Sequence, residues 1–274
     1  MMLLHAKERT LDLSTPQVMG ILNITPDSFS DGHRDEPVMF RVEQMVQQGA
    51  AIIDVGGEST RPGWTPISEQ AEMDRICPVI ERIAHSFDVM ISVDTYKAAV
   101  MKAACDAGAH LLNDINGFRN TDAIDCAVDT GAALCVMHMD GDITHMHNAV
   151  AERDILQNVS RFFRQKVDEL IAAGIDGNRI LLDPGFGFGK THQQNMHLLK
   201  HLCRIEYGMD YPLLVGLSRK RMVGEMIGKA VHDRTTGSVA AAMYSVLNGA
   251  KVVRVHDVGE TVDALNVIRH LAQA

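Results

Sequence analysis

The sequence predicts an α/β fold, a single (β/α)8 TIM barrel with a short N-terminal extension. A phrase recurs along the chain, in which a glycine suited to ending a helix precedes an apolar run of strand length, as in "QGAAIIDVGG" from Gln48 and "NGAKVVRVHD" from Asn248. Together with further apolar runs that lack this phrase, eight runs of strand length alternate with amphipathic helical stretches. The length of 274 residues suits one barrel of this kind, which typically has about 250.

In chain order, residues 1–17 are expected to form an N-terminal extension over the bottom of the barrel, and residues 18–274 the barrel domain. Helices expected between the strands, for example at 38–48, 71–87 and 159–173, imply parallel strands that are buried on both faces. An open, doubly wound sheet is the alternative arrangement. The eight strands are expected at residues 18–24, 51–56, 89–94, 111–115, 132–137, 179–183, 213–217 and 252–256.

The composition argues against several classes of partner. A formal net charge of −9 at pH 7 disfavours nucleic acid. No stretch approaches the roughly 18 apolar residues of a membrane span, and charged residues interrupt the N-terminal apolar run, so we expect no membrane partner and a cytoplasmic location. The cysteines form no C-x-x-C pair and are expected to be buried, reduced thiols; they are Cys77, Cys105, Cys126, Cys135 and Cys203.

Every predicted strand ends in polar residues. Active sites of such barrels lie at the carboxyl ends of the strands, so these side chains are expected to converge on one pocket. They are Asn23, Asp54, Glu58, Asp94, Asn113, Asp114, His138, Asp183, Ser218, Arg219, Lys220, Arg254 and His256.

The polar residues divide into two chemical groups, which suggests a substrate with two unlike halves. Carboxylates and an amide, from Asp94, Asn113 and Asp183, suit a flat heterocycle with an N–C–N edge of hydrogen-bond donors. The cationic group suits an anion with several charges, such as a phosphate leaving group, and consists of Arg61, Arg219, Lys220, Arg254 and His256. Asn23 offers an amide oxygen for Mg²⁺ shared with substrate phosphates.

Several of these residues have a structural alternative. Asp54 and Glu58 are as well explained by pairing with Arg61 or with loop amides, and Asp114 by orienting its neighbours. For His138 a satisfied histidine of the core is the favoured interpretation.

The segment "DPGFGFGKT" at residues 183–191 superficially resembles a phosphate-binding loop. That loop requires glycine where Pro184 stands, so the pattern fails, and Asp183 at the strand end is the informative residue. Two further segments rich in glycine, proline and serine, at residues 23–32 and 57–64, are expected to close over a bound substrate.

The motifs together resemble the dihydropteroate synthase family. They are "MGILNITPDSFSDG", "AIIDVGGESTRPG", "SVDT", "LLNDINGF", "LLDPGFGFGKT", "GLSRKRMVG" and "VVRVHDV", in the order and approximate spacing of that family, between Met19 and Leu265. The resemblance implies a transferase that joins 6-hydroxymethyl-7,8-dihydropterin diphosphate to 4-aminobenzoate and releases pyrophosphate. It also implies Mg²⁺ dependence, a homodimer and inhibition by sulfonamides.

The resemblance also implies roles for matching residues. The pterin would be held by Asp94, Asn113, Asp183 and Lys220, the diphosphate by Arg254, His256 and Asn23, and Mg²⁺ by Asn23. The 4-aminobenzoate site would consist of Thr60, Arg61, Pro62, Phe188 and Ser218, while Phe29 and Asp31 would close over the reacting carbon. The implied mechanism is dissociative: pyrophosphate departs, and the weakly basic arylamine attacks the cationic methylene that remains.

Two other functions remain open. One is a corrinoid-type methyltransferase domain, which shares the barrel and the pterin carboxylates but needs no diphosphate site. The other is a degenerate relative that binds a pterin without turnover.

Overall fold

A closed barrel of parallel strands forms the centre of the molecule, as a computed structural model describes it for residues 2–24, 36–58, 65–141, 143, 154–205 and 210–273. The strands of these residues are β1 (Leu3–Ala6), β2 (Arg9–Asp12), β3 (Gln17–Asn23), β4 (Ile52–Gly56), β5 (Met90–Asp94), β6 (Leu111–Asp114), β7 (Ala133–Met137), β8 (Ile180–Asp183), β9 (Leu213–Val215) and β10 (Ala250–Val255). The barrel order is β10-β3-β4-β5-β6-β7-β8-β9, with parallel pairing throughout. The predicted (β/α)8 barrel is confirmed, the strand ends agree within two residues, and the open sheet is excluded.

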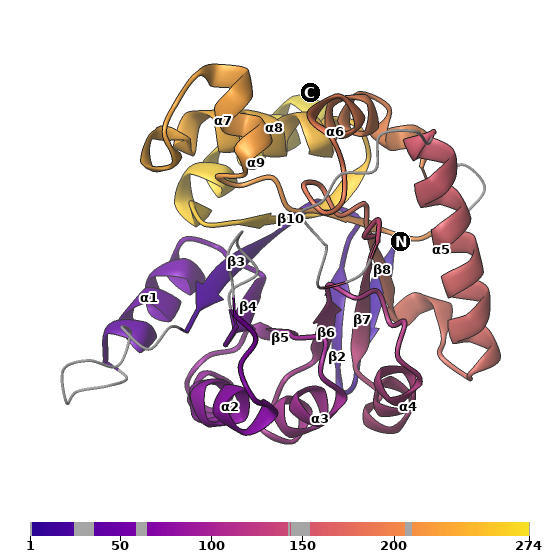
Figure 1. Cartoon of the computed structure of the whole chain (residues 1–274). Helices are drawn as coiled ribbons and strands as arrows, with labels where there is room; N and C mark the ends of the chain where they lie inside the picture. Colours follow the sequence, from indigo (N-terminus) through magenta and orange to yellow (C-terminus); the bar gives the residue numbers. More distant parts are fainter. Residues whose placement is uncertain are drawn as a thin grey trace.

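Helices surround the barrel in chain order, from α1 at the left of Figure 1 through α5 at the right to α7, α8 and α9 at the upper left. In the described residues the last crossover, between β9 and β10, carries two helices where one would suffice. The helices are α1 (Glu36–Gln47), α2 (Glu69–Ser86), α3 (Ala98–Asp106), α4 (Thr121–Thr130), α5 (Ile155–Ala172), α6 (His192–Lys200), α7 (Arg221–Ile227), α8 (Thr235–Leu247) and α9 (Val258–Gln273). Short 3-10 turns are η3 (Gly177–Arg179), η4 (Leu202–Arg204) and η5 (Val231–Asp233).

The recurring sequence pattern, a glycine followed by an apolar run, forms the connection between a helix and the next strand. Its glycine follows the last helical turn with a positive φ, a conformation that glycine adopts without a steric penalty, and the chain then enters the next strand. This holds for Gly49, Gly108, Gly131, Gly174 and Gly249. Helix starts are also set locally, since Ser68 and Asp154 cap α2 and α5 and Thr191 forms a capping box with Gln194 at α6.

The lower, amino-terminal half of the barrel interior is apolar. Alternate residues of a strand point to the same face, and in the lowest inward layer these residues form one buried cluster: Met19, Ile52, Met90, Leu111, Ala133, Leu181, Leu214 and Val252. The hairpin of β1 and β2 covers this end, because Leu4, Ala6 and Leu13 are buried in the same cluster. The division of the chain into an extension and a barrel domain at residue 17 stays a prediction.

One expectation about the cysteines is wrong. All five are free thiols, as expected, but Cys203 is exposed and Cys77 is half-buried. Cys203 lies in the short turn η4, whereas Cys105, Cys126 and Cys135 are buried in the apolar core. Among the described helices, none is both long and apolar enough to cross a membrane.

Candidate active site

The second inward layer of the barrel is polar, although it lies on the same strand faces as the apolar layer. Two residues further along five of the eight strands, the inward positions hold Asp54, Ser92, Asn113, Asp183 and Arg254. The carboxylates and the amide are almost fully buried, with Asp54 at 0%, Asn113 at 5% and Asp183 at 7% exposure. Buried charged groups require partners, so the contacts of this layer define the site.

Arg254 joins Asp54 of this layer to Asp94, which lies two residues beyond Ser92 on β5. Its Nε donates to Asp54 Oδ2 at 2.5 Å, and its Nη2 donates to Asp94 Oδ2 at 2.6 Å. Asn113 Nδ2 donates to the same Asp54 oxygen at 3.2 Å. Burial raises the pKa of Asp94 to about 7, although the charge of Arg254 opposes this. Burial disfavours the charge of Arg254, but Asp54 and Asp94 together hold its pKa above the usual value.

Asp183 and Lys220 form the second charged group of the mouth. Asp183 Oδ1 accepts the Gly185 N–H at 2.8 Å. Burial raises the pKa of Asp183, while the charge of Lys220 opposes that rise. Burial in turn lowers the pKa of Lys220 to about 8, against the attraction of Asp183. Lys220 is therefore a hydrogen-bond donor, and its pKa depends on the carboxylate of Asp183 beside it.

The loop between β8 and α6 brings backbone and aromatic groups to Lys220. Lys220 Nζ donates to Phe186 O at 2.5 Å and lies 4.8 Å from the centroid of the Phe188 ring. At Gly185 the loop comes close to the segment that follows β7. A Cβ atom on Gly185 would lie 1.9 Å from His138 O. Only glycine fits at that position, which explains part of the "DPGFGFG" pattern.

Ser218, His256 and Asn23 complete the polar rim. Ser218 Oγ accepts the backbone N–H of His256 at 3.1 Å. The same oxygen lies 3.0 Å from the ring nitrogen Nδ1 of His256, so Ser218 fixes the orientation of the imidazole. The Oδ1 of Asn23 and the Oδ2 of Asp94 both lie close to Gly56, at 3.7 and 3.8 Å from the position that a Cβ would take there. Arg219, by contrast, is bound to Asp257 at 2.5 Å, so its charge is paired.

An apolar wall beside these groups was missed by the sequence analysis. Ile115, Met137 and Met139 are buried together, and Tyr96, Ile143 and Phe188 pack against them. Ile115 follows Asn113 by two residues, so the parity of the strand could have placed it on the inward side. The mouth therefore offers an apolar wall next to hydrogen-bonding carboxylates, which suits a flat, polar-edged ring.

For Asp114 and Glu58, the observed contacts agree with a structural role. Asp114 accepts the N–H groups of Asn116 and Phe118, both at 2.7 Å, and so holds the turn after β6. Glu58 pairs with Lys97 at 2.6 Å and accepts the Ile67 N–H at 3.0 Å. Asp54, in contrast, belongs to the central layer.

His138 is buried, as the core interpretation expects, but it is not fully satisfied. Its Nδ1 has no hydrogen-bond partner among the described residues. Burial holds the pKa of His138 well below its usual value.

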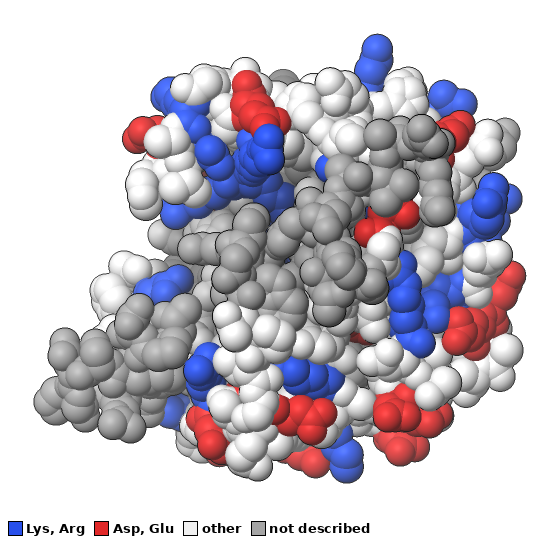
Figure 2. Space-filling model, in the orientation of Figure 1, with Lys and Arg blue, Asp and Glu red and all other residues white. Residues whose placement is uncertain are grey.

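Several predicted site residues lie outside the described residues, as do most of the two expected closing segments. They are Phe29, Asp31, Thr60, Arg61 and Pro62. In Figure 2, Lys and Arg side chains gather at the upper left, over α7. This gives the acidic chain a locally cationic surface.

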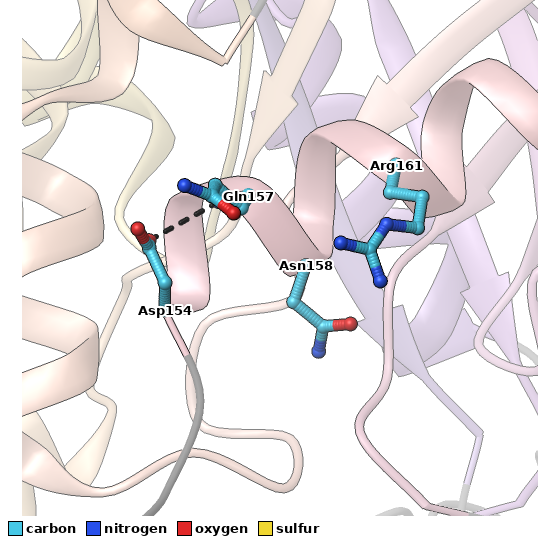
Figure 3. A pocket seen from close by; sticks show the side chains of 4 residues that line it. All are labelled: Asp154, Gln157, Asn158 and Arg161. Atoms are coloured by element: carbon cyan, nitrogen blue, oxygen red, sulfur yellow. Dashed lines mark hydrogen bonds between the residues drawn. The ribbon is translucent and has the colours of Figure 1, made fainter.

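A separate surface depression lies at the start of α5, where Asp154, Gln157, Asn158 and Arg161 line it (Figure 3). Asp154 caps the helix by accepting the N–H groups of Leu156 and Gln157 at 3.1 and 3.2 Å. These contacts explain the carboxylate as a helix cap, and none of the lining residues belongs to the predicted site.

Comparisons with known proteins agree with this geometry. The family model for the pterin binding enzyme matches residues 19–256. The dihydropteroate synthase of Escherichia coli (strain K12) is 44% identical over 270 residues, which are 97% of this chain and 95% of that protein. A crystal structure of the Yersinia pestis dihydropteroate synthase with a sulfonamide drug complex is 47% identical, covers 100% of both chains and has a TM-score of 0.92.

Two structures of Xanthomonas albilineans dihydropteroate synthase are also similar. The complex with 4-aminobenzoic acid is 42% identical, covers 100% of this chain and 99% of that chain, and has a TM-score of 0.93. The complex with 7,8-dihydropteroate is 39% identical, covers 99% of each chain and has a TM-score of 0.89. The family model, the near-complete relatives and the polar mouth of the barrel agree, and the chain belongs to the dihydropteroate synthase family of pterin binding enzymes.

Proposed function

We propose that the chain condenses 6-hydroxymethyl-7,8-dihydropterin diphosphate with 4-aminobenzoate to give 7,8-dihydropteroate and pyrophosphate. The observation that carries this is the buried polar group at one mouth of the barrel, where Arg254 binds Asp54 and Asp94. Asn113 binds Asp54 there, and Asp183 is buried in the same inward layer as Asp54. Acidic and amide acceptors suit the heterocycle, and the cation beside them suits its phosphate tail.

The pterin half is assigned to Asp94, Asn113, Asp183 and Lys220. The two carboxylates accept the N–H groups of the heterocycle, and Lys220 donates to its ring carbonyl. The apolar wall of Ile115 and Met137 supports one face of the ring. Binding of the donor edge favours the ionised form of Asp94, whose pKa burial has raised to about 7.

The diphosphate half is assigned to Arg254 and His256. The bonds of Arg254 to the two carboxylates use the Nε hydrogen and one Nη2 hydrogen, and the N–H groups of Nη1 and the second one of Nη2 are assigned to oxygens of the substrate. Ser218 Oγ accepts a backbone N–H, so its own hydrogen is available to His256 Nδ1. In that arrangement the imidazole carries its proton on Nε2, the nitrogen assigned to the diphosphate.

Asn23 fits a role in holding Mg²⁺. Its Oδ1 is a hard oxygen at the mouth, close to the carboxylate of Asp94. The described residues contain no group of three His, Cys, Asp or Glu that could hold a metal ion, and Mg²⁺ bound through substrate phosphates needs only one or two protein oxygens. When bound, the ion supplies positive charge to the phosphate oxygens.

The arylamine half is assigned to Phe188 and Ser218, together with Thr60, Arg61 and Pro62. Phe188 packs beside Lys220, which places an aromatic face next to the pterin groups. Phe29 and Asp31 are assigned to the reacting carbon. These assignments rest on the resemblance and on the position of the described members at the mouth.

The proposed reaction is dissociative. The C–O bond of the pterin methylene breaks, and its electron pair leaves with the diphosphate, whose charge Arg254 and His256 stabilise. The buried carboxylates stabilise the cationic methylene. The nitrogen of 4-aminobenzoate then forms the new C–N bond and releases one proton to solvent. No strong base is required, because the arylamine is weakly basic and already neutral.

A single assay tests the function. The chain is supplied with the pterin diphosphate, 4-aminobenzoate and Mg²⁺, and pyrophosphate release is measured with and without the arylamine. We expect release that depends on 4-aminobenzoate. Pterin binding without release would instead support the degenerate relative, and indifference to 4-aminobenzoate would support the methyltransferase.

A homodimer is the proposed assembly, and the described surface offers an apolar face for it. Leu247 of α8 is 67% exposed, and Val267 and Leu271 of α9 are 57% and 72% exposed, on two helices that pack against each other. We expect Leu247→Glu with Leu271→Glu to shift the sedimentation coefficient from dimer to monomer. A wild-type chain that sediments as a monomer would contradict the dimer.

A further inference from the structure

Lys190 is the lysine of the "DPGFGFGKT" segment, and its ammonium group is held by backbone carbonyls. The residue is 7% exposed. Its Nζ donates to Gly185 O at 2.8 Å, to Phe188 O at 3.1 Å and to His138 O at 3.2 Å. An ammonium has three donors, so these bonds use all of them and link two points of the β8–α6 loop to the strand end after β7.

The loop that Lys190 holds carries groups of the proposed site. Gly185 donates to Asp183, Phe186 accepts from Lys220, and the Phe188 ring lies beside that lysine. The backbone carbonyls of Gly185 and Phe188 are bound by Lys190 itself. A change in the position of Lys190 would therefore displace Phe188 directly.

Lys190 has no carboxylate bound to its ammonium among the described residues, and a buried charge of this kind is a costly way to fill space. Burial lowers the pKa of Lys190 to about 7, even though Asp183 attracts its charge. A methionine would occupy a similar volume without this cost, but it would remove the ammonium donor from three carbonyls, of which Gly185 O keeps only the Phe188 N–H at 3.2 Å. The side chain of Asn195 also forms hydrogen bonds with this loop. It accepts the Gly187 N–H at 2.8 Å and donates to Thr191 O at 2.8 Å.

We propose that Lys190 is a positioning residue for the arylamine step, which fixes the carbonyls of the β8–α6 loop and so sets the place of the Phe188 ring. The inference rests on the proposed function. Lys190 contacts neither substrate in this account, and it acts through the loop. The pterin is held by Asp94 and Asn113 as well, which lie on other strands, so the arylamine depends on the loop more than the pterin does.

The test compares Lys190→Met with Lys166→Met. Lys166 is also 7% exposed and donates to a backbone carbonyl, Phe118 O at 2.8 Å, but it lies on α5. We expect K190M to raise KM for 4-aminobenzoate about 10- to 100-fold, since small misplacements of positioning groups have effects of that size. KM for the pterin diphosphate should change by less than about threefold, and K166M should leave both values near wild type.

A double-mutant cycle with Phe188→Ala identifies the route of the effect. If Lys190 acts through the Phe188 ring, the double variant should have the same KM for 4-aminobenzoate as F188A alone. Additive increases in KM would overturn the proposal. So would a K190M variant that matches K166M in both KM values.

Two further results keep the outcomes separate. Should K190M fail to fold, Asn195→Ala weakens the same loop, and it should raise KM for 4-aminobenzoate selectively; an unchanged KM would overturn the inference. If the wild-type chain shows no arylamine-dependent release of pyrophosphate, the proposed function fails. If it shows release and the loop variants behave like K166M, only the role of Lys190 fails.

Discussion

The lower and upper layers of the barrel interior use the same strands and the same inward face, but their chemistry is opposite. In the lower layer Met19, Ile52 and Leu181 pack against the N-terminal hairpin. Two residues further along, the carboxyl groups of Asp54 and Asp183 are buried. The apolar layer gains free energy from burial, whereas the polar layer must satisfy each charge with a partner.

On five of the strands, the apolar packing and the residues of the proposed site are therefore separated by only two positions. The carboxylates of the upper layer are kept in an environment that raises the pKa of Asp94 to about 7 by burial. Such groups make the fold less stable than apolar residues would, and they persist where a ligand needs them. Substitutions in the two layers should therefore give opposite patterns of stability and kinetics.

The largest effect is expected where the upper layer is broken at its centre. Arg254→Met removes the partner of two buried carboxylates and should lower the free energy of unfolding by about 3–5 kcal/mol, as seen when one partner of a buried pair is removed. Turnover should fall roughly 100- to 1000-fold, because the variant loses the donor that we propose for the leaving group. Urea unfolding and steady-state kinetics measure both changes.

The control for this variant is Arg221→Met. Arg221 is 90% exposed at its side chain and pairs with Glu225 at 2.7 Å. Both measurements should stay near wild type, because an exposed ion pair contributes little. An Arg254 variant as stable as the control would mean that the carboxylates lose their charge without penalty, which would contradict the pairing described for this layer.

The lower layer should behave in the reverse way. Leu181→Ala, at a residue that is 0% exposed, should lower the free energy of unfolding by about 2–5 kcal/mol through the cavity that it leaves. Both KM values should stay within about twofold of wild type. Asp183→Asn, two residues along the same strand, should weaken pterin binding about 10- to 100-fold with little loss of stability. Equal kinetic damage from the two variants would remove the distinction between the layers.

The fold could be predicted from the sequence because its signals are local. The glycines that end helices, the apolar runs and the helical periodicity each depend on neighbouring residues, and together they gave the strands within two residues. The second helix between β9 and β10 was not anticipated, since α7 has only seven residues, Arg221–Ile227, and such a short element leaves a weak periodic signal.

The site was predictable at the level of position and less so at the level of contacts. Strand ends in a closed barrel converge, so the polar set could be named. The joining of Arg254 to both Asp54 and Asp94 could not, because it depends on side-chain directions across a barrel, between residues up to 200 positions apart. The binding of Lys190 to three carbonyls could not be predicted from the sequence either. There the segment "DPGFGFGKT" only resembled a phosphate-binding loop, whose pattern fails at Pro184.

The smallest expected effect concerns the charge states within the upper layer. In the proposed pterin site, Asp94 accepts N–H groups when it is ionised, and Lys220 donates when it is protonated. Burial raises the pKa of Asp94 to about 7 and lowers that of Lys220 to about 8. The value of kcat/KM for the pterin diphosphate should therefore rise as the pH increases through about 7 and fall as it increases through about 8, by about tenfold per pH unit outside this window.

Two variants assign the limbs of this profile. Asp94→Asn removes the group that ionises near pH 7, so the acid limb should flatten while the alkaline limb stays. Lys220→Met should flatten the alkaline limb instead. Both variants lower kcat/KM overall, so the shape of the curve between pH 5.5 and 9.5, roughly 1.5 units beyond each pKa, is the quantity to compare. Because the substrates titrate identically with every variant, limbs that persist in both would place the titrating groups in the substrates and not in the barrel.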